Sequence, residues 1–330
     1  MHYQAPWWLP DGHTQTIWAA LYARPRRGLP RALVRERWTT PDGDFVDVDC
    51  QAASAPGRPM LVLFHGLEGS SASHYAQAFA DWAAEHDVHW VLPHFRGCSG
   101  ELNHGPRAYH SGDHEEIDWI LQQLRRRQLA AGGRCLMAAG VSLGGNALMR
   151  WAGEQGQAAA RVVDAIAAIC SPLDLAASGQ AIGRGFNRMV YTRMFLRTMK
   201  PKALAKLRQY PGLFQRERLL AARDLYEFDN VFTAPLHGFR DTEDYWRRAS
   251  ARPVLSRIQV PALLLNPLND PFVPARSLPA RREVGPLVTL WQPRHGGHVG
   301  FAEGRWPGHV RGLPDRVGAW LMTAAGAAHG

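Results

Sequence analysis

The chain has 330 residues, of which 46% are hydrophobic and 20% are charged, and its formal net charge is +9. This composition is that of a globular protein with an ample core, and the length allows one large α/β domain with an insertion or two ordinary domains. The sequence contains no Cys/His zinc spacing, P-loop or dinucleotide-binding glycine fingerprint, and no run of about 18 apolar residues that would predict a membrane-spanning helix.

Residues 1–30 are rich in aromatic residues and proline. We expect them to form an N-terminal arm that packs over the domain. The alternative is a contact with lipid or with a partner through the tryptophans of this arm, Trp7, Trp8 and Trp18. Residues 33–50 then contain two β-like runs around a turn at residues 41–44, which predicts a β-hairpin.

From residue 60 onward, short apolar runs alternate with amphipathic segments. Continuous apolar runs of this length predict strands buried on both faces, and the amphipathic segments between them predict helices. The predicted strands are residues 60–64, 88–92, 135–139 and 162–170, and the predicted helices are residues 74–85, residues 112–128 and a segment that begins at Asn146. Strands and helices in this order predict a parallel, doubly wound sheet.

Residues 173–250 interrupt the alternation, because they contain no clear strand and read as several amphipathic helices separated by proline and glycine. A helical insertion after a sheet strand is expected to form a cap or lid over the C-terminal edge of the sheet. The alternation resumes with predicted strands at residues 260–266 and 287–291 and a closing helix at residues 310–324. We therefore predict an α/β core made of residues 1–172 and 251–330, and a helical cap made of residues 173–250.

Residues 134–150 carry the clearest chemical signal. A small apolar run is followed by the sequence GVSLG, residues 140–144, and then by a helical pattern. This is the strand–turn–helix context of the G-x-S-x-G nucleophile elbow, in which small residues on both sides of the serine leave room for a sharp turn. Such a turn raises the Ser142 hydroxyl clear of the sheet and places the Leu143 N–H at a helix N-terminus, where an oxyanion is stabilised. For the pattern alone, a glycine-rich turn with an incidental serine is the alternative.

Two later loops supply the groups that a serine nucleophile needs. Asp270 follows the predicted strand at residues 260–266, and His298 follows the one at residues 287–291. The carboxyl ends of parallel strands meet at one edge of the sheet, and the order Ser, Asp, His is that of an α/β-hydrolase triad. Histidine can accept the serine proton near neutral pH, and a carboxylate can fix its tautomer and stabilise its positive charge. We therefore predict a catalytic triad of Ser142, Asp270 and His298.

Each of these assignments has an alternative. His295 is the competing base, and we favour His298 because the two glycines just before it let its loop approach the serine. Taken alone, Asp270 would be interpreted as a turn residue ahead of a proline. Ser99 is a second serine candidate, but its loop lacks the strand–turn–helix context.

The HGLEG loop follows the first strongly apolar strand. Hydrolases place the second oxyanion donor there, so we predict that the backbone N–H groups of Leu67 and Leu143 form an oxyanion hole. We interpret His65 as a residue that fixes its loop. Tyr109 and His110 are expected to brace the FRGCSG loop and to cap the helix that follows them.

Several longer motifs point to a family. They lie between residues 12 and 301 and so cover nearly the whole chain: GHTQTIWAAL, TTPDGDFVDVD, HGLEGSSASHYA, HFRGCSGELN, YHSGDHEEI, GVSLGGN, EFDN, HGF, DYWRRAS, NPLNDPF and HGGHVGF. In these motifs the chain resembles the YheT-like esterases, whose eukaryotic relatives are α/β-hydrolase-domain acylglycerol lipases and yeast medium-chain ethyl ester esterases. The resemblance implies the α/β-hydrolase fold and a carboxylic ester hydrolase with the triad Ser142, Asp270 and His298.

The chain departs from this family at one position beside the acid. Residues 267–270 read PLND, where relatives tend to have a lysine and two acids. Asn269 replaces the first acid, which leaves Asp270 as the only candidate acid at this position.

We predict a serine esterase that cleaves short- to medium-chain acyl esters through an acyl-enzyme on Ser142. Two alternatives use the same triad: an alcohol acyltransferase or ester synthase, in which an alcohol accepts the acyl group, and a membrane-associated acylglycerol lipase. A third alternative, a non-catalytic binding module, is disfavoured by the intact triad.

The partner that we expect is a small-molecule acyl ester, with no nucleic acid, cofactor or metal. The basic residues are scattered along the chain, which favours a solvated basic surface, although peripheral membrane contact stays an alternative. Four widely spaced cysteines and the absence of a signal pattern predict reduced thiols and a cytoplasmic location. The oligomeric state is left open.

Overall fold

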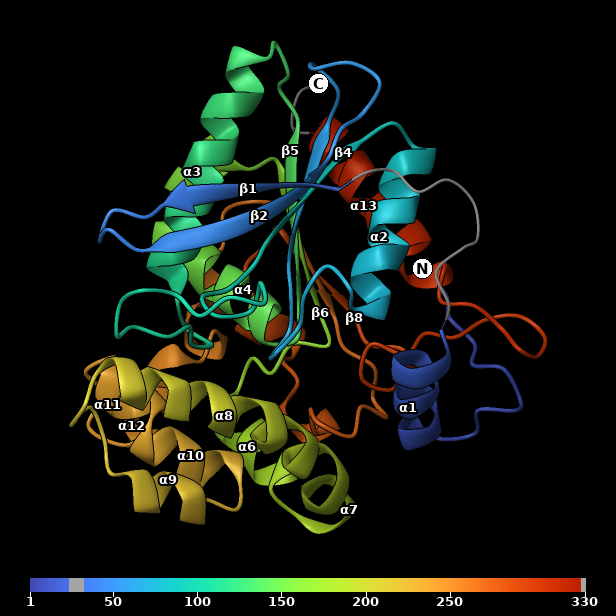
Figure 1. Cartoon of the computed structure of the whole chain (residues 1–330). Coiled ribbons are helices and arrows are strands. Elements are labelled where there is room, and N and C mark those ends of the chain that lie inside the picture. Colours follow the sequence, from blue (N-terminus) through green and yellow to red (C-terminus); the bar gives the residue numbers. More distant parts are fainter. Residues whose placement is uncertain (24–32, 328–330) are drawn as a thin grey trace.

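In the computed structural model, which describes residues 1–23 and 33–327, eight strands form one sheet (Figure 1). Their order in the sheet is β1-β2-β4-β3-β5-β6-β7-β8. The strands are β1 (Val34–Thr39), β2 (Phe45–Gln51), β3 (Met60–Phe64), β4 (His89–Pro93), β5 (Leu136–Val141), β6 (Ala165–Ile169), β7 (Ala262–Leu265) and β8 (Val288–Trp291). Strands β3 to β8 pair in parallel, whereas β2 pairs antiparallel with β1 and β4. The predicted hairpin and the mostly parallel, doubly wound sheet are confirmed.

Helices cover both faces of this sheet (Figure 1). One face carries α2 (His74–Glu85) and α13 (Gly312–Ala327), and the other carries α3 (His114–Ala130), α4 (Leu143–Gln155) and the short α5 (Ala159–Val162). Successive residues of β5 alternate between the two layers, since Met137 packs on the α2 side and Ala138 on the α3 side. Burial on both sides is why the central strands read as continuous apolar runs.

Between β6 and β7 the chain is helical, and no strand interrupts it. The elements are α6 (Leu175–Ile182), α7 (Gly185–Asn187), a π-helical turn η2 (Arg188–Thr192), α8 (Arg193–Gln209), α9 (Arg216–Ala221), α10 (Leu225–Val231), α11 (Thr233–Leu236) and α12 (Thr242–Ala249), followed by a 3₁₀ turn η3 (Arg252–Arg257) that leads to β7. They gather at one end of the sheet (Figure 1) and form small apolar clusters of their own. We refer to residues 173–250 as the cap and propose that they form a lid over the site described below.

The N-terminal arm contains a helix that the sequence pattern does not predict, α1 (Gly12–Tyr22). Asp11 caps this helix by accepting a hydrogen bond from the backbone N–H of Thr14. Trp18 is buried against the loop that precedes α13, whereas Trp7 is 89% exposed. Helix α1 therefore packs on the domain through Trp18, and residues 24–30 of the predicted arm lie outside the described residues.

All four cysteines are free thiols. None of the helices in the described ranges combines the length and the apolar character that a membrane crossing requires.

Candidate active site

Ser142 lies at the tip of the turn between β5 and α4. Its backbone adopts φ 53° and ψ −118°, a region that residues with a side chain rarely occupy, and its N–H donates to the carbonyl of Ile169 over 2.8 Å. A Cβ at Gly144 would lie 2.5 Å from the carbonyl oxygens of Phe64 and His65, so only glycine lets α4 approach β3 this closely. The local geometry is that of the predicted elbow.

Backbone strain concentrates where Ser142 lies, at the edge of the sheet formed by the carboxyl ends of the parallel strands. Six described residues other than glycine have a positive φ: Glu68, Asp87, Ser142, Cys170, Val299 and Phe301. All except Asp87 lie in loops that follow the carboxyl ends of β3, β5, β6 and β8. Strained residues of this kind cluster at functional sites, and in open α/β sheets such sites lie at this edge.

The structure brings the three predicted triad residues together. The Nε2 atom of His298 lies 3.0 Å from the Oγ atom of Ser142, and its Nδ1 atom lies 2.9 Å from Oδ2 of Asp270. The Asp270 side chain is fully buried, and its Oδ1 accepts hydrogen bonds from the backbone N–H groups of Phe272 and Val273. A carboxylate can only accept, so Nδ1 carries the proton and Nε2 is free to accept the serine proton.

The competing candidates lie elsewhere. Neither His295 nor Ser99 lines the cavity that contains Ser142 and His298. The Ser99 hydroxyl donates to Asp47 over 2.6 Å, which gives it a structural partner. The geometry therefore supports His298 over His295 and Ser142 over Ser99.

The predicted oxyanion donors face the same cavity as Ser142. Leu67 and Leu143 both line it, and within the described residues neither backbone N–H has a hydrogen-bond acceptor. His65 fixes the loop that carries Leu67: its Nδ1 donates to the carbonyl of Gly66, and its Nε2 accepts from the N–H of Phe95. Burial lowers the pKa of His65 to about 3, so this histidine stays neutral, as the loop-fixing interpretation requires.

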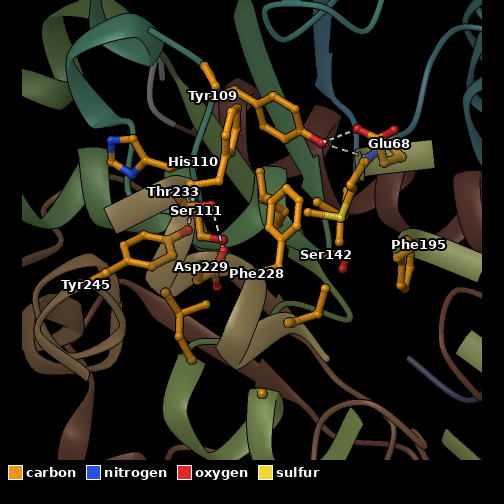
Figure 2. A pocket seen from close by; sticks show the side chains of 18 of the residues that line it. Glu68, Tyr109, His110, Ser111, Ser142, Phe195, Phe228, Asp229, Thr233 and Tyr245 are labelled. Atoms are coloured by element: carbon orange, nitrogen blue, oxygen red, sulfur yellow. Dashed lines mark hydrogen bonds between the residues drawn. The ribbon is translucent and has the colours of Figure 1, made fainter. Parts of the chain in front are cut away.

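Tyr109 has a role at the oxyanion loop that the sequence does not reveal. Its ring stacks on Phe95 of the FRGCSG loop, as expected, but its hydroxyl also donates to the Glu68 carboxylate over 2.9 Å and accepts from the Glu68 N–H over 3.0 Å (Figure 2). Lys202 of the cap pairs with the same carboxylate over 2.9 Å. These contacts hold the residue that follows Leu67 at its positive φ, and no local signal in the sequence links positions 68 and 109.

A cavity that is partly open to solvent extends from Ser142 and His298 into the cap. Its walls are mainly apolar, and Phe195 and Phe228 line it together with Ser142 (Figure 2). Among the apolar residues of the cap, Phe195 lines the cavity and Leu196 is buried, whereas three others are exposed: Phe186, Met189 and Met194.

Polar groups occupy the cap side of this cavity (Figure 2). Asp229 accepts hydrogen bonds from Thr233 Oγ1 over 2.6 Å and from Trp246 Nε1 over 2.9 Å. Burial raises the pKa of Asp229 to about 6. The carboxyl group thus braces the cap and adds a polar group to a mainly apolar wall.

Only one group of His, Cys and carboxylate side chains in the described residues is close enough to hold a metal ion, and it is Cys170, Asp270 and His298. Burial raises the pKa of the Cys170 thiol well above its ordinary value, which disfavours the thiolate that a metal would need. The other two side chains already bond to each other. These three side chains do not contradict the expectation that the chain binds no metal, and that expectation stays a prediction.

Comparison with known proteins identifies the family and the fold of the chain. The sequence profile of the family described as alpha/beta hydrolase fold matches residues 59–305. The chain is 38% identical to the YheT protein of Escherichia coli (strain K12), whose name assigns it to the esterases, over 94% of this chain and 90% of that protein. It is 28% identical to phospholipase ABHD3 of Mus musculus, over 81% of this chain and 66% of that protein.

Among solved structures, the chain is similar to the esterase Pf2001 of Pyrococcus furiosus. The TM-score is 0.57 at 15% identity, and the match covers 91% of this chain and 98% of that one. At this identity the likeness bears on the fold alone.

Proposed function

We propose that this chain, which belongs to the alpha/beta hydrolase fold family and to its YheT-like branch, is a serine carboxylic ester hydrolase that acts on short- to medium-chain acyl esters. The observation that carries the proposal is the hydrogen-bonded series from Ser142 through His298 to Asp270. This series opens onto an apolar cavity beside two unpaired backbone N–H groups.

In the proposed reaction, His298 Nε2 accepts the hydroxyl proton of Ser142 as the serine oxygen attacks the ester carbonyl carbon. The N–H groups of Leu67 and Leu143 stabilise the negative charge that develops on the carbonyl oxygen. His298 then gives its proton to the leaving alcohol, and the acyl-enzyme remains. Water, activated by the same histidine, releases the acid and restores Ser142, while Asp270 stabilises the imidazolium formed in each half of the reaction.

The mainly apolar lining of the cavity, roofed by the cap, supports acyl chains of intermediate length. Phe195 and Phe228 give it an apolar wall, and each methylene buried against such a wall contributes ~0.8 kcal/mol. We therefore expect kcat/KM to rise several-fold per two carbons from acetyl esters to butyryl–octanoyl esters. It should fall again for palmitoyl esters, because the cap limits the length that fits.

The test is a series of p-nitrophenyl esters from acetyl to palmitoyl, with Ser142→Ala as the blank and Ser99→Ala as the matched control. Hydrolysis that Ser142→Ala abolishes and Ser99→Ala retains supports the proposal. Equal turnover by wild type and Ser142→Ala contradicts it, and a flat chain-length profile contradicts the acyl pocket. Adding an alcohol and analysing the products distinguishes hydrolysis from acyl transfer.

A membrane-associated acylglycerol lipase on the same triad is the second candidate, and one surface of the cap favours it. Three apolar side chains are exposed there, Phe186 by 47%, Met189 by 66% and Met194 by 53%. Exposed arginines stand among them: Arg184, Arg188, Arg193 and Arg197. Apolar side chains interleaved with arginine suit shallow insertion into an anionic bilayer.

Flotation with vesicles of phosphatidylglycerol or phosphatidylcholine tests this second candidate. Binding to phosphatidylglycerol that is lost in the double variant Met189→Ser, Met194→Ser supports it. The matched control is Leu129→Ser, which removes an apolar side chain that is 56% exposed at the end of α3, away from the cap. Failure of the wild-type protein to float with either vesicle contradicts it.

A further inference from the structure

The helix α1 contacts both loops that carry the proposed base and acid. The Oγ1 atom of Thr16 accepts a hydrogen bond of 2.8 Å from the backbone N–H of His298. The Oε1 atom of Gln15 accepts one of 2.8 Å from the N–H of Gly296 in the same loop. The acid loop reaches this same oxygen, because Asn269 Nδ2 donates to it over 3.1 Å. One amide oxygen therefore links the base loop to the acid loop.

Neighbouring backbone groups fix the orientation of both amides. The Nε2 atom of Gln15 donates to the carbonyl of Leu9 over 2.9 Å, which leaves its Oε1 to face the loops. The Oδ1 atom of Asn269 accepts from the N–H of Gly297 over 3.0 Å, which turns its Nδ2 toward Gln15. Rotating either amide by half a turn would leave a buried backbone group without its partner, which is unfavourable.

The contact is buried and tightly packed. Gln15 is 0% exposed. A Cβ at Gly297, where φ is 57°, would lie 2.7 Å from the carbonyl oxygen of Gly12, and a Cβ at Gly12 would lie 1.9 Å from the carbonyl oxygen of Asn269. Glycine at these two positions lets the backbone of α1 rest directly on both loops.

We propose that Gln15 is a positioning residue that holds the base loop and the acid loop at the separation that the His298–Asp270 hydrogen bond requires. Gln15 does not line the cavity, so it acts through His298 and not on the substrate. It also precedes residues 59–305, the part of the chain that matches the family profile. The inference rests on the triad assigned in the proposed function.

Loss of this amide should slow the reaction without weakening substrate binding. Gln15→Met keeps the length of the side chain but leaves the Gly296 N–H and the Asn269 amide without their acceptor. A displacement of about 1 Å at a reacting group can cost ~10² in rate. We therefore expect kcat to fall roughly 10–100-fold while KM changes by no more than about twofold.

Two further variants separate positioning from stability. Gln15→Glu loses the amide donor to Leu9, as Gln15→Met does, but keeps an acceptor oxygen toward the loops. Its melting temperature should fall as in Gln15→Met, whereas it should retain most of the wild-type kcat. Asp11→Ala removes the N-cap of the same helix without touching either loop, so it should lower the melting temperature and leave kcat unchanged.

The experiment measures kcat and KM on the best p-nitrophenyl ester, the melting temperature, and the rate at which a fluorophosphonate labels Ser142. A selective loss of kcat and of labelling rate in Gln15→Met, with recovery in Gln15→Glu, supports the proposal. Wild-type kcat in Gln15→Met overturns it, as does a loss of activity that follows melting temperature across all three variants. A wild-type protein inert to both the ester and the fluorophosphonate would refute the proposed function itself, and the inference with it.

Discussion

The nucleophile turn and the base–acid pair are held in place in different ways. Ser142 sits in a turn that its own neighbours enforce, since a Cβ at Gly140 would lie 2.5 Å from the carbonyl oxygen of Gly144. His298 and Asp270 instead sit on loops held by α1, through hydrogen bonds that span 254 to 282 residues of sequence.

This difference follows from what each group must do. A nucleophile needs a strained, exposed backbone position, and a short glycine-rich segment can supply the sharp turn itself. A base and its acid need two loops at a set separation, so side chains from a third segment must hold them. Replacements in the elbow should therefore disturb packing and chemistry together, whereas replacements in α1 should act mainly through the histidine.

The largest effect is expected at the base itself. His298→Ala should lower kcat by ~10⁶, about as much as Ser142→Ala, and the double variant should lose little more because the two residues act as one unit. The measurement is kcat on the preferred p-nitrophenyl ester.

The matched control for this prediction is His295→Ala, in the same loop but outside the cavity wall. It should keep most of the activity. If His295→Ala were inactive and His298→Ala active, the assignment of the base would be wrong.

Replacing the acid should lower kcat less than replacing the base does, but more than replacing any packing residue. In Asp270→Asn, the oxygen that accepts the Phe272 and Val273 N–H groups should keep its place, so the new NH₂ group would point at His298 Nδ1. That nitrogen must then accept, which puts the proton on Nε2 and stops it from acting as the base. We expect a loss of ~10⁴ in kcat. A loss below about tenfold would show that tautomer control lies elsewhere.

In the nucleophile elbow, Gly144→Ala should lower both the stability of the protein and kcat. The new Cβ would lie 2.5 Å from the carbonyl oxygens of Phe64 and His65 and would push α4 away from β3 and the oxyanion loop. We expect about 1–3 kcal/mol of lost stability and ~10² in kcat, measured by thermal unfolding and ester hydrolysis.

Gly57→Ala is the control for this variant, because its Cβ would have no neighbour closer than 3.5 Å, an ordinary contact. Gly57→Ala should change neither the stability of the protein nor kcat. Full activity in Gly144→Ala would mean that the elbow tolerates the bulk that its geometry excludes.

The parts of the fold that were predictable are those with local or periodic signals. The central strands are buried on both faces and are apolar throughout, and the elbow is set by glycines within five residues of sequence. Helix α1 escaped prediction because its buried face carries Gly12, Gln15 and Thr16 in place of a regular row of large apolar side chains.

Side-chain directions in the cap were not predictable for a related reason. The π-helical turn at Arg188–Thr192 adds a residue to the helical period and so shifts the register of the helix α8 that comes after it. A regular helical pattern drawn through this segment cannot show that Phe195 lines the cavity while Met189 and Met194 face outward. The link from Tyr109 to the oxyanion loop likewise joins residues that only the tertiary fold brings together.

The smallest effect is expected at Thr16, the second residue of α1 that binds the base loop. The Thr16 hydroxyl accepts the His298 N–H and donates to the carbonyl of Gly12, so Thr16→Val, which keeps the shape of the side chain, would leave the His298 N–H unpaired. The imidazole would still have its bond to Asp270 and its contact with the Phe272 ring, whose centroid lies 4.2 Å away. We therefore expect kcat to fall by roughly 3–10-fold, which corresponds to about 1 kcal/mol of lost positioning, with KM nearly unchanged. Thr16→Ser keeps the hydroxyl and should restore the wild-type kcat. If Thr16→Val and Thr16→Ser had the same kcat, α1 would hold the histidine by packing alone, and the contrast between a locally built nucleophile and a remotely held base would rest on Gln15.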